Sequence, residues 1–475
     1  MFHKKSEKGQ ALVLIALAAV GLFGFTALSI DGGMVFSDRR HAQNAADTAV
    51  LAAALARVRS VSDPDGAAKL AGEARAISNG YGVPNDLDRI VEVNICDEPG
   101  IVCEGMPVGA IPSDYVRVKI TSIVRTTFAR IVGRATVTNV VTAVARAKVG
   151  GPSPVFDGSA LVALSQTDPD AVGAGGNVNL DINNSGVFSN SSDTCAMSGT
   201  GNINVSVDTA YNIVGGHCQN GSVNFGGGPI QSTSQIEYPP DLDIPAPTIT
   251  CSGNGQITPD ATPNHFTIHP GNYPSLTLNN GTYTFVGNGE FCFHGNVSIN
   301  GNTDVIANHV DILVTAGSFD INGNSTFNCD YMLVYITGGS GMHFNGNGTN
   351  TCTNVTFYAE QGSVTWNGNV ANTFTAPSPT SAGGVHQEYA NLLIYMPYGN
   401  TSPLHINGNA GNTLTGSIIA ISSDVTISGN SGTTGFNSNI TGYTVTLAGN
   451  SNTVINYRPE DQLTVMDPSD LGLIK

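Results

Sequence analysis

The chain has 475 residues, and its 36 Asp and Glu outnumber its 19 Lys and Arg. All but two of the cations lie before residue 151, so the rest of the chain has only Arg458 and Lys475 against 22 acids. A part with so few cations cannot hold the phosphates of a nucleic acid, which excludes nucleic-acid binding there. The change in composition near Gly150 also predicts a domain boundary.

The first predicted element is a membrane anchor over residues 10–30. This stretch contains no charged side chain, and at about 1.5 Å per residue it is long enough for one hydrocarbon core. Asp31 and two glycines follow it in place of a small-residue cleavage site, which argues against a removed signal peptide. Lysines in the basic tail, residues 1–9, place the N-terminus in the cytoplasm. We therefore expect a single-pass protein of the cytoplasmic (inner) membrane with its C-terminal domains extracytoplasmic.

A stem helix is predicted next, over residues 31–60. The stretch 37–60 is rich in alanine and has no Pro or Gly, which favours a helix. Several of its alanines recur at spacings of three and four residues and form a seam of small side chains on one face. The seam suits a partner helix, or equally the packing of the stem on the domain that follows. The seam residues are Ala42, Ala45, Ala46, Ala49 and Ala53.

The stretch KGQALVLIALAAVGLFGFTALSIDGG (8–33), followed by RRHAQNAADTAVLAAAL (39–55), resembles the N-terminal part of TadG-like Flp (tight adherence) pilus-assembly proteins. The resemblance covers about residues 8–60. It implies a pseudopilin-like membrane protein whose partners are other pilus-assembly proteins, such as TadE-like ones. A processed prepilin has Glu at the fifth position after its Gly, where this chain has Leu14 after Gly9, so we do not expect cleavage. The D-x-S-x-S motif of many relatives does not occur in this sequence.

A small α/β domain is expected over residues 61–150. Asp63 can cap a helix that begins at Pro64 and stops near Gly80. The stretches 89–95 and 115–123 alternate apolar and polar residues, which predicts half-buried strands. A short helix (126–133) and a third strand (135–148) follow. The combination of a long stem with this helix-on-sheet head is pilin-like in outline.

Residues 151–457 contain an internal repeat centred on Asn-Gly-Asn, as in VSINGN (297–302). The steps between successive copies are 22, 23, 22, 40, 21 and 20, since the copies begin at Val297, Phe319, Met342, Val364, Leu404, Val425 and Val445. A period near 22 with short alternating strands predicts an all-β, right-handed parallel β-helix with one coil per period. We expect a loop insertion (375–390) to account for the step of 40, a Pro-rich interruption at 238–248, and a tail at 458–475.

The asparagines of the repeat are expected at one corner of successive coils. Stacked amides can then form a ladder of hydrogen bonds, and the glycine that follows each asparagine suits a corner with positive φ. The ladder residues are Asn300, Asn322, Asn345, Asn367 and Asn407.

The eight cysteines form sequence neighbours: Cys96/Cys103, Cys195/Cys218, Cys251/Cys292 and Cys329/Cys352. An even number beyond a membrane anchor predicts disulfides in an oxidising compartment, with buried free thiols as the alternative. The step from Cys329 to Cys352 equals the step from Asn322 to Asn345, so both cysteines occupy the same place on adjacent coils. Adjacent coils are about 4.8 Å apart, within the range of a disulfide. Cys195 and Cys218 have the same spacing.

The function expected from these features is that of an anchored pilus-assembly protein that displays a solenoid for assembly or adhesion, without cofactor or metal. The ligand of the solenoid is left open between a glycan, another surface and another subunit. A glycan-active β-helix enzyme of the polygalacturonase type is the alternative. It needs paired carboxylates, for which Asp304, Asp311, Asp320 and Asp330 are the candidates if they are neighbours on successive coils. Acids that serve solubility are the simpler interpretation, and we expect no enzymatic activity.

Overall fold

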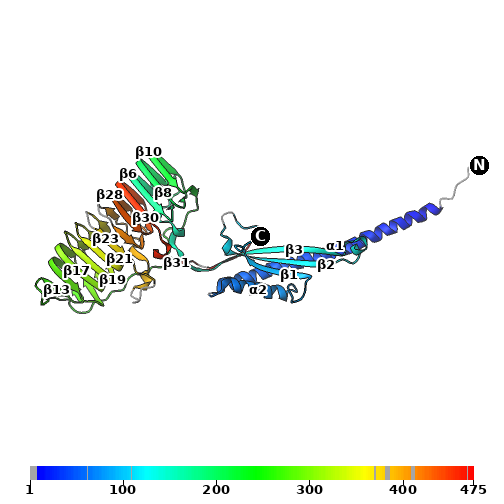
Figure 1. The fold of residues 1–475 in the computed structure, drawn as a ribbon, viewed down its shortest axis with the longest axis horizontal. Helices are drawn as coiled ribbons and strands as arrows, with labels where there is room; N and C mark the ends of the chain where they lie inside the picture. Colours follow the sequence, from blue (N-terminus) through cyan, green and yellow to red (C-terminus); the bar gives the residue numbers. More distant parts are fainter. Residues whose placement is uncertain are drawn as a thin grey trace, which may run out of the picture. The chain divides into compact units, whose positions relative to one another are not determined.

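The computed structural model describes residues 8–60, 62–107, 110–367, 371–379, 386–407, 412–467 and 469–474. The chain forms two compact units, the first made of Met1–Pro152 with Met466–Lys475 and the second of Ser153–Val465. Helices and strands of both are labelled in Figure 1. The domain boundary expected near Gly150 lies two residues further on.

The first unit is a long helix on an antiparallel sheet. Asp63 caps α2, as its side chain accepts a hydrogen bond from the N–H of Gly66. The sheet has the order β1-β2-β3-β32. The elements are α1 (Lys8–Arg59), α2 (Pro64–Ser78), β1 (Arg89–Ile95), η1 (Pro112–Asp114), β2 (Tyr115–Arg125), η2 (Ala129–Val132), β3 (Thr136–Lys148) and β32 (Asp470–Leu473).

The C-terminal stretch expected to be a tail returns to the first unit. β32 pairs antiparallel with β3, with Ala145 opposite Leu473. The two connecting segments, β4 (Gly151–Pro154) and β31 (Thr464–Asp467), pair as a two-stranded ribbon. The second unit is therefore an insertion between two strands of the first. The sequence does not predict the edge strand at 470–473, because so short a stretch has too little periodicity to identify a strand.

The second unit is a parallel β-solenoid. Its elements up to residue 232 are η3 (Val155–Gly158), β5 (Leu161–Ala163), β6 (Val172–Asn183), β7 (Val187–Ser189), β8 (Met197–Val207), β9 (Tyr211–Ile213), β10 (His217–Gly227) and β11 (Ile230–Ser232). The next are β12 (Ile257–Pro259), β13 (His265–Ile268), β14 (Gly271–Tyr273), β15 (Leu276–Phe285), β16 (Gly289–Phe293), β17 (Val297–Val314), β18 (Ser318–Ile321), β19 (Thr326–Ile336), β20 (Gly341–Phe344), β21 (Thr349–Ala359), β22 (Ser363–Trp366) and β23 (Ala371–Thr375). The last are η4 (Gln387–Tyr389), β24 (Leu392–Met396), β25 (Leu404–Asn407), β26 (Thr413–Thr415), β27 (Ser417–Ala420), β28 (Val425–Asn437), β29 (Ile440–Gly442), β30 (Val445–Asn456) and η5 (Pro459–Asp461).

Strand register reproduces the repeat seen in the sequence. Val297 pairs with Phe319, so the starts of two successive copies lie side by side on adjacent coils. Val364 pairs with Leu404 in the same way, so the step of 40 is also one coil. The loop insertion lies within that coil, with residues 380–385 outside the described part. The right hand of the coil stays a prediction.

The order of the coils in space differs from their order in the chain. β30, the last long strand, pairs in parallel with β6, so that Val445 lies beside Val172. β29 likewise pairs with β5. The coils formed by residues 161–232 therefore continue the stack beyond its C-terminal coil, while β13 lies at the opposite end (Figure 1). The repeat in the sequence does not indicate this order of the coils.

Residues 233–256, here called the return segment, connect the two ends of the solenoid. At one end the N–H of Ile236 donates to Asn190 at 2.8 Å. Midway, the hydroxyl of Tyr389 donates to the carbonyl of Pro245 at 3.1 Å. At the other end Cys251 is bonded to Cys292 of β16. The Pro-rich stretch is thus an extended connection along the solenoid. Prolines suit its stretch 238–248, which belongs to no strand of the described structure.

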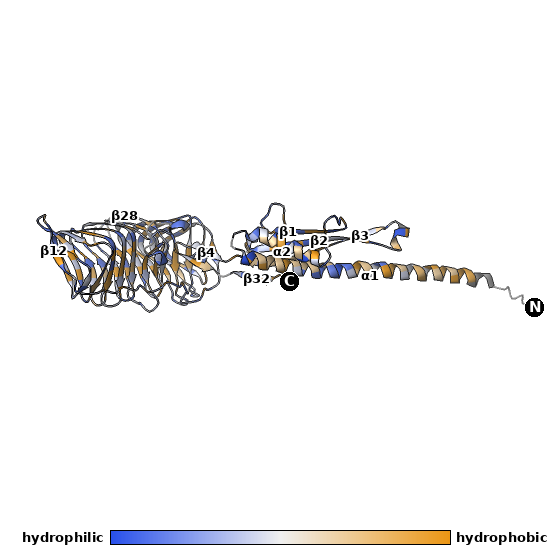
Figure 2. Ribbon diagram, turned by 90° about the horizontal axis from the view of Figure 1, so that it is seen from below, coloured by the Kyte–Doolittle hydropathy of each residue, from blue (hydrophilic) through white to orange (hydrophobic). Residues whose placement is uncertain are grey.

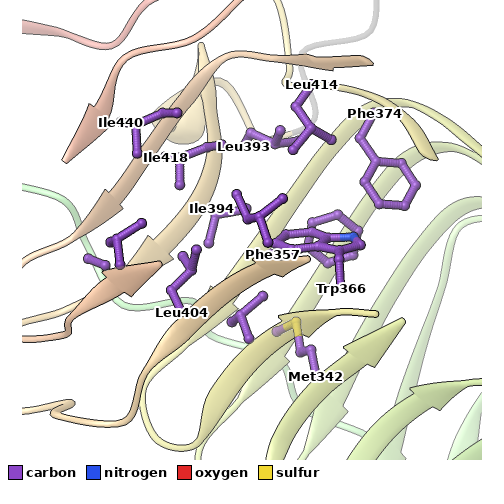
Figure 3. Close-up of a cluster of buried hydrophobic side chains, with 14 of the residues drawn as sticks. Met342, Phe357, Trp366, Phe374, Leu393, Ile394, Leu404, Leu414, Ile418 and Ile440 are labelled. Carbon is purple, nitrogen blue, oxygen red and sulfur yellow. The ribbon is translucent and has the colours of Figure 1, made fainter. Parts of the chain in front are cut away.

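The solenoid interior is a continuous apolar core. Trp366 is 1% exposed and stacks on Phe344, with ring centroids 5.2 Å apart. Figure 3 shows Trp366 among inward-pointing side chains that include Phe357 and Ile394. At the Asn-Gly-Asn corners, Gly323 has φ +74°, and a Cβ there would lie 2.7 Å from a backbone oxygen of the preceding coil. Glycine is required at this corner for both reasons.

Candidate functional site: helix α1 and the solenoid surface

The N-terminal part of α1 is apolar and uncovered. Among the described residues, α1 is the helix whose length and apolar composition would allow it to cross a membrane. Figure 2 shows its hydrophobic colouring, and Phe23 and Phe25 are 75% and 77% exposed. Such a surface is stable only where apolar surroundings cover it. A single-pass membrane anchor is compatible with this helix.

Asp31 stands where the apolar part ends and is 3% exposed. Its carboxylate accepts hydrogen bonds from three successive backbone N–H groups, those of Thr127, Phe128 and Ala129, at 2.8, 2.9 and 2.6 Å. Burial alone raises the pKa of Asp31, but these three donors lower it below its ordinary value. The carboxylate therefore fixes the loop between β2 and β3 to the helix. We call this contact the Asp31 clamp.

In the sequence, Asp31 marks only the end of the uncharged span. Its donors lie 96–98 residues further along the chain. Every residue except proline has a backbone N–H, so the sequence does not indicate which of these groups bind Asp31. An acid directly beside an apolar run is the one available signal, because such a residue needs a partner.

The alanine seam faces the protein's own sheet. Ala45, Ala46, Ala49 and Ala53 are at most 2% exposed, and Ala42 is 1% exposed. They belong to one core with residues of the sheet such as Val116 and Val118. The prediction of a partner-helix seam at these five residues is wrong, and the alternative, packing on the following domain, is what the structure has. Small side chains are needed because α1 lies directly on the strands.

Polar side chains fasten the same part of α1. Asn139 donates to Asp38 at 2.8 Å. Arg57 is 7% exposed and donates to the carbonyls of Ser113 and Ala147 at 2.6 and 2.9 Å. Residues 31–59 of α1 are therefore an integral part of the first unit.

All eight cysteines lie in four disulfides, which join the four sequence neighbours. Cys329 and Cys352 are direct register partners on β19 and β21, with Cα atoms 4.4 Å apart. Cys195 and Cys218 are bonded with Cα atoms 5.0 Å apart. Cys218, however, is in register with Ser198, because the coil there is shorter than the spacing of the two cysteines. The predicted pair Cys195–Cys218 is therefore confirmed, but the two cysteines are not register partners.

The five expected asparagines form an unbroken ladder. Each side-chain amide donates to the preceding asparagine, at 3.1 Å for Asn322, Asn345 and Asn367 and at 3.0 Å for Asn407. Ser428 continues the ladder on the next coil by donating to Asn407. The ladder is a structural feature of the coil corner, because its donors and acceptors are used within it.

A second ladder lies inside the solenoid and was missed. Asn350 donates to Asn372 at 2.8 Å, and Asn372 donates to Asn412 at 3.0 Å. Asn350 and Asn372 are fully buried, and Asn412 is 4% exposed. Asn350 and Asn372 are register partners, so they do occupy the same place on adjacent coils. That repeat was available in the sequence, but it lies outside the Asn-Gly-Asn motif.

The four aspartates considered for an enzyme are not register neighbours of one another. Asp304 lies beside Thr282 and Thr326. Asp320 lies 2.7 Å from Nδ1 of His343, and Asp330 accepts from Thr353 at 2.6 Å. These four aspartates therefore do not meet the condition set for an enzyme of the polygalacturonase type, which is that they be neighbours on successive coils.

A different carboxylate pair lies beside a hollow of about 450 Å³. Glu290 and Asp311 are register partners on β16 and β17 and both line the hollow, with His309. His386 Nε2 lies 2.7 Å from Asp311. Burial alone lowers the pKa of His386, but the carboxylates of Asp311 and Glu388 raise it above its ordinary value. Among the described residues, no group of three or more His, Cys, Asp or Glu can hold a metal ion.

Residues 9–57 match the family model described as "Putative Flp pilus-assembly TadE/G-like". The match coincides with α1 and contains Asp31, Asp38 and Arg57. Searches of curated proteins and of solved structures find no match to the chain. The family match therefore concerns the helix, while the solenoid is known from its geometry alone.

Proposed function

We propose that the chain is a membrane-anchored component of a Flp pilus-assembly apparatus that carries a β-solenoid outside the membrane. The observation that carries this proposal is the TadE/G-like match over residues 9–57, which coincides with an exposed apolar helix. The helix-on-sheet unit supports a pilin-like role for the first unit, since its core is built around the second half of α1.

The orientation that we propose has the N-terminus in the cytoplasm. Lys4, Lys5 and Lys8 precede the span and favour the cytoplasmic side. The four disulfides support an extracytoplasmic location for everything after Asp31. Protease added to intact spheroplasts should digest the solenoid, and a solenoid that stays protected would contradict this orientation.

The partners that we propose are TadE-like membrane proteins, contacted through residues 12–30 of α1. The side chains of this stretch are exposed and can contact a partner, whereas those of the alanine seam are buried. A photo-crosslinking residue in place of Phe25, which is 77% exposed, should capture such proteins in cells that carry the apparatus. The same residue in place of Ile111, which is 62% exposed on the head, is the control. Equal capture from both positions would count against a contact through the helix.

We propose a display role for the solenoid, in assembly or adhesion, and no catalysis. The engagement of Asp304, Asp320 and Asp330 with Thr and His side chains supports this. One observation favours a glycan ligand, namely the Glu290/Asp311 pair beside the hollow. Glycan-array binding that is lost in Glu290→Gln would identify such a ligand. Turnover of an acidic glycan that is lost in the same variant would establish the enzyme instead.

A further inference from the structure

The loop between β2 and β3, residues 126–135, is held at a defined position along α1. We call it the hairpin tip. The Asp31 clamp joins its backbone to the helix one residue beyond the uncharged stretch 10–30. If that stretch crosses a membrane, the hairpin tip lies at the membrane surface, because the clamp leaves it no freedom to move along the helix.

The hairpin tip presents apolar side chains beside the helix. Phe128 and Ile131 are 38% and 81% exposed. Between the tip and α1 runs an apolar groove of about 620 Å³, whose lining includes Val20, Phe23, Gly24, Ala27, Phe128 and Ile131. The groove continues the surface of the helix that has to be in hydrocarbon. Its natural occupant is therefore the same acyl chains that surround the helix.

Cations flank these apolar residues. Arg130 and Arg134 are exposed, and neither makes an ion pair with a described carboxylate, whereas Arg125 pairs with Asp88 at 3.0 Å. Arginine binds phosphate well, and basic residues near a membrane surface are attracted to anionic lipids. Apolar side chains flanked by arginines fit the boundary between headgroups and acyl chains.

We propose that the hairpin tip is a second membrane contact, with Phe128 and Ile131 in the acyl boundary and Arg130 and Arg134 on the phosphates of anionic phospholipids. The proposal rests on the membrane anchor of the proposed function. It adds a second point of attachment, which limits the tilt of the first unit relative to the membrane surface.

The test uses the full-length protein in lipid vesicles. Because all eight cysteines are in disulfides, an introduced cysteine can be labelled specifically with an environment-sensitive fluorophore. The label at Ile131→Cys should show blue-shifted emission and strong quenching by lipids that carry a spin label near the headgroup. The label at Ile111→Cys, exposed at the other end of the sheet, should be quenched from water and not from lipid.

A label at Phe23→Cys separates failure of the proposal from failure of the anchor. If lipid quenches the Phe23 label while the Ile131 label is quenched from water, the anchor stands and the proposal is overturned. If neither label meets lipid, the anchor itself is wrong. If the Ile131 label is shielded from water only when a second membrane protein is added, the groove binds a protein. That result also overturns the proposal.

The arginines are tested by lipid composition. Vesicles of neutral lipid should give weaker lipid quenching at Ile131→Cys than vesicles that also contain anionic phospholipid. Replacing Arg130 and Arg134 with Gln should abolish this difference. The matched control replaces Arg59 and Arg75, both exposed and away from the tip, and should retain it. An unchanged response in the first variant overturns the role of the arginines.

Discussion

The side-chain amide of Asn179 donates a hydrogen bond to the side-chain oxygen of Asn452 at 3.0 Å, across 273 residues of sequence. Asn204 donates in turn to Asn179, and Asn224 to Asn204, at 2.7 and 2.8 Å. One ladder thus crosses from the last long strand to the coils that come first in the chain. The core of the second unit is complete only when both ends of its sequence have met.

The first prediction tests this coil order. Cysteines in place of Asn179 and Asn452 should form a disulfide, because the two residues are register partners on adjacent strands and the Cα separation suits the bond. Non-reducing peptide mapping detects the bond. Cysteines at Ser298 and Asn452 are the control and should stay reduced, since Ser298 has Thr277 and Asp320 as its register partners. A stack in chain order would leave both pairs reduced.

The period of the solenoid could be predicted from the sequence, but the coil order could not. Steps such as Val297 to Phe319 are local and repeat in the register. In-register stacking, however, gives the same ladder for any two coils with Asn at the corner, so the repeat cannot identify which coils are neighbours. The return segment, from 233 to 256, can reach about 80 Å when extended. Its length was compatible with a full return, and its prolines suggested only a loop.

The candidate site shows the same limit. The Asn300–Asn407 ladder follows from a repeated motif and was predictable. The Asp31 clamp joins one side chain to backbone groups almost 100 residues away, and no local pattern encodes it. The alanine seam was visible in the sequence, but small residues at helical spacing permit close packing on any surface. Only the tertiary structure decides that the surface is the protein's own sheet.

The second prediction concerns the buried ladder. Asn372→Ala removes the acceptor of Asn350 and one of two donors to the Asn412 side-chain oxygen, which keeps the backbone N–H of residue 372. We expect the variant to destabilise the solenoid by about 2–3 kcal/mol, mainly through the unpaired buried amide of Asn350. Asn322→Ala, in the half-buried outer ladder, should cost about 1 kcal/mol. Denaturant unfolding followed by the fluorescence of Trp366, the single tryptophan, measures both. A larger loss for Asn322→Ala would contradict the assignment of the buried ladder.

The third prediction is a pH dependence from His386. The pKa of His386 is raised in the folded state by Asp311 and Glu388. Its contribution to stability is therefore complete below its unfolded pKa of about 6.5. It is lost as the pH rises through the folded-state pKa. The melting temperature of the wild type should therefore fall as the pH rises from about 6.5 through the folded-state pKa of His386.

His386→Gln should remove that part of the decrease. His217→Gln, at an exposed position, is the control and should keep it. A wild-type melting temperature that rises with pH over the same window would contradict the ion pair between His386 and Asp311.

The fourth prediction concerns the Asp31 clamp. Asp31→Ala leaves the N–H groups of Thr127, Phe128 and Ala129 without their acceptor. Hydrogen exchange at these amides should become faster, while exchange at β2, which keeps its strand pairing, should not change. In the wild type the clamp should persist down to about pH 4 and weaken below it. The reason is that the carboxylate has a lowered pKa and loses its stabilising charge only as the pH falls through that value. Equal exchange rates in wild type and variant would show that the clamp does not hold the tip.

The last prediction separates the two units. Because the solenoid is an insertion whose connecting segments β4 and β31 are paired, residues 155–463 can be replaced by a short Gly-rich turn without breaking the sheet. The remaining chain should fold, since its core is formed by α1, α2 and the strands of the first unit. Formation of the Cys96–Cys103 disulfide and resistance to protease measure the fold. The control lacks residues 466–475 as well. It should be less stable, because β3 loses its pairing with β32 and Arg146 loses its 2.7 Å ion pair with Asp470.

If assembly contacts lie on α1, the first variant should still capture TadE-like membrane proteins while losing whatever the solenoid contributes to attachment. Loss of capture in a variant whose head is folded would assign the assembly contact to the solenoid instead.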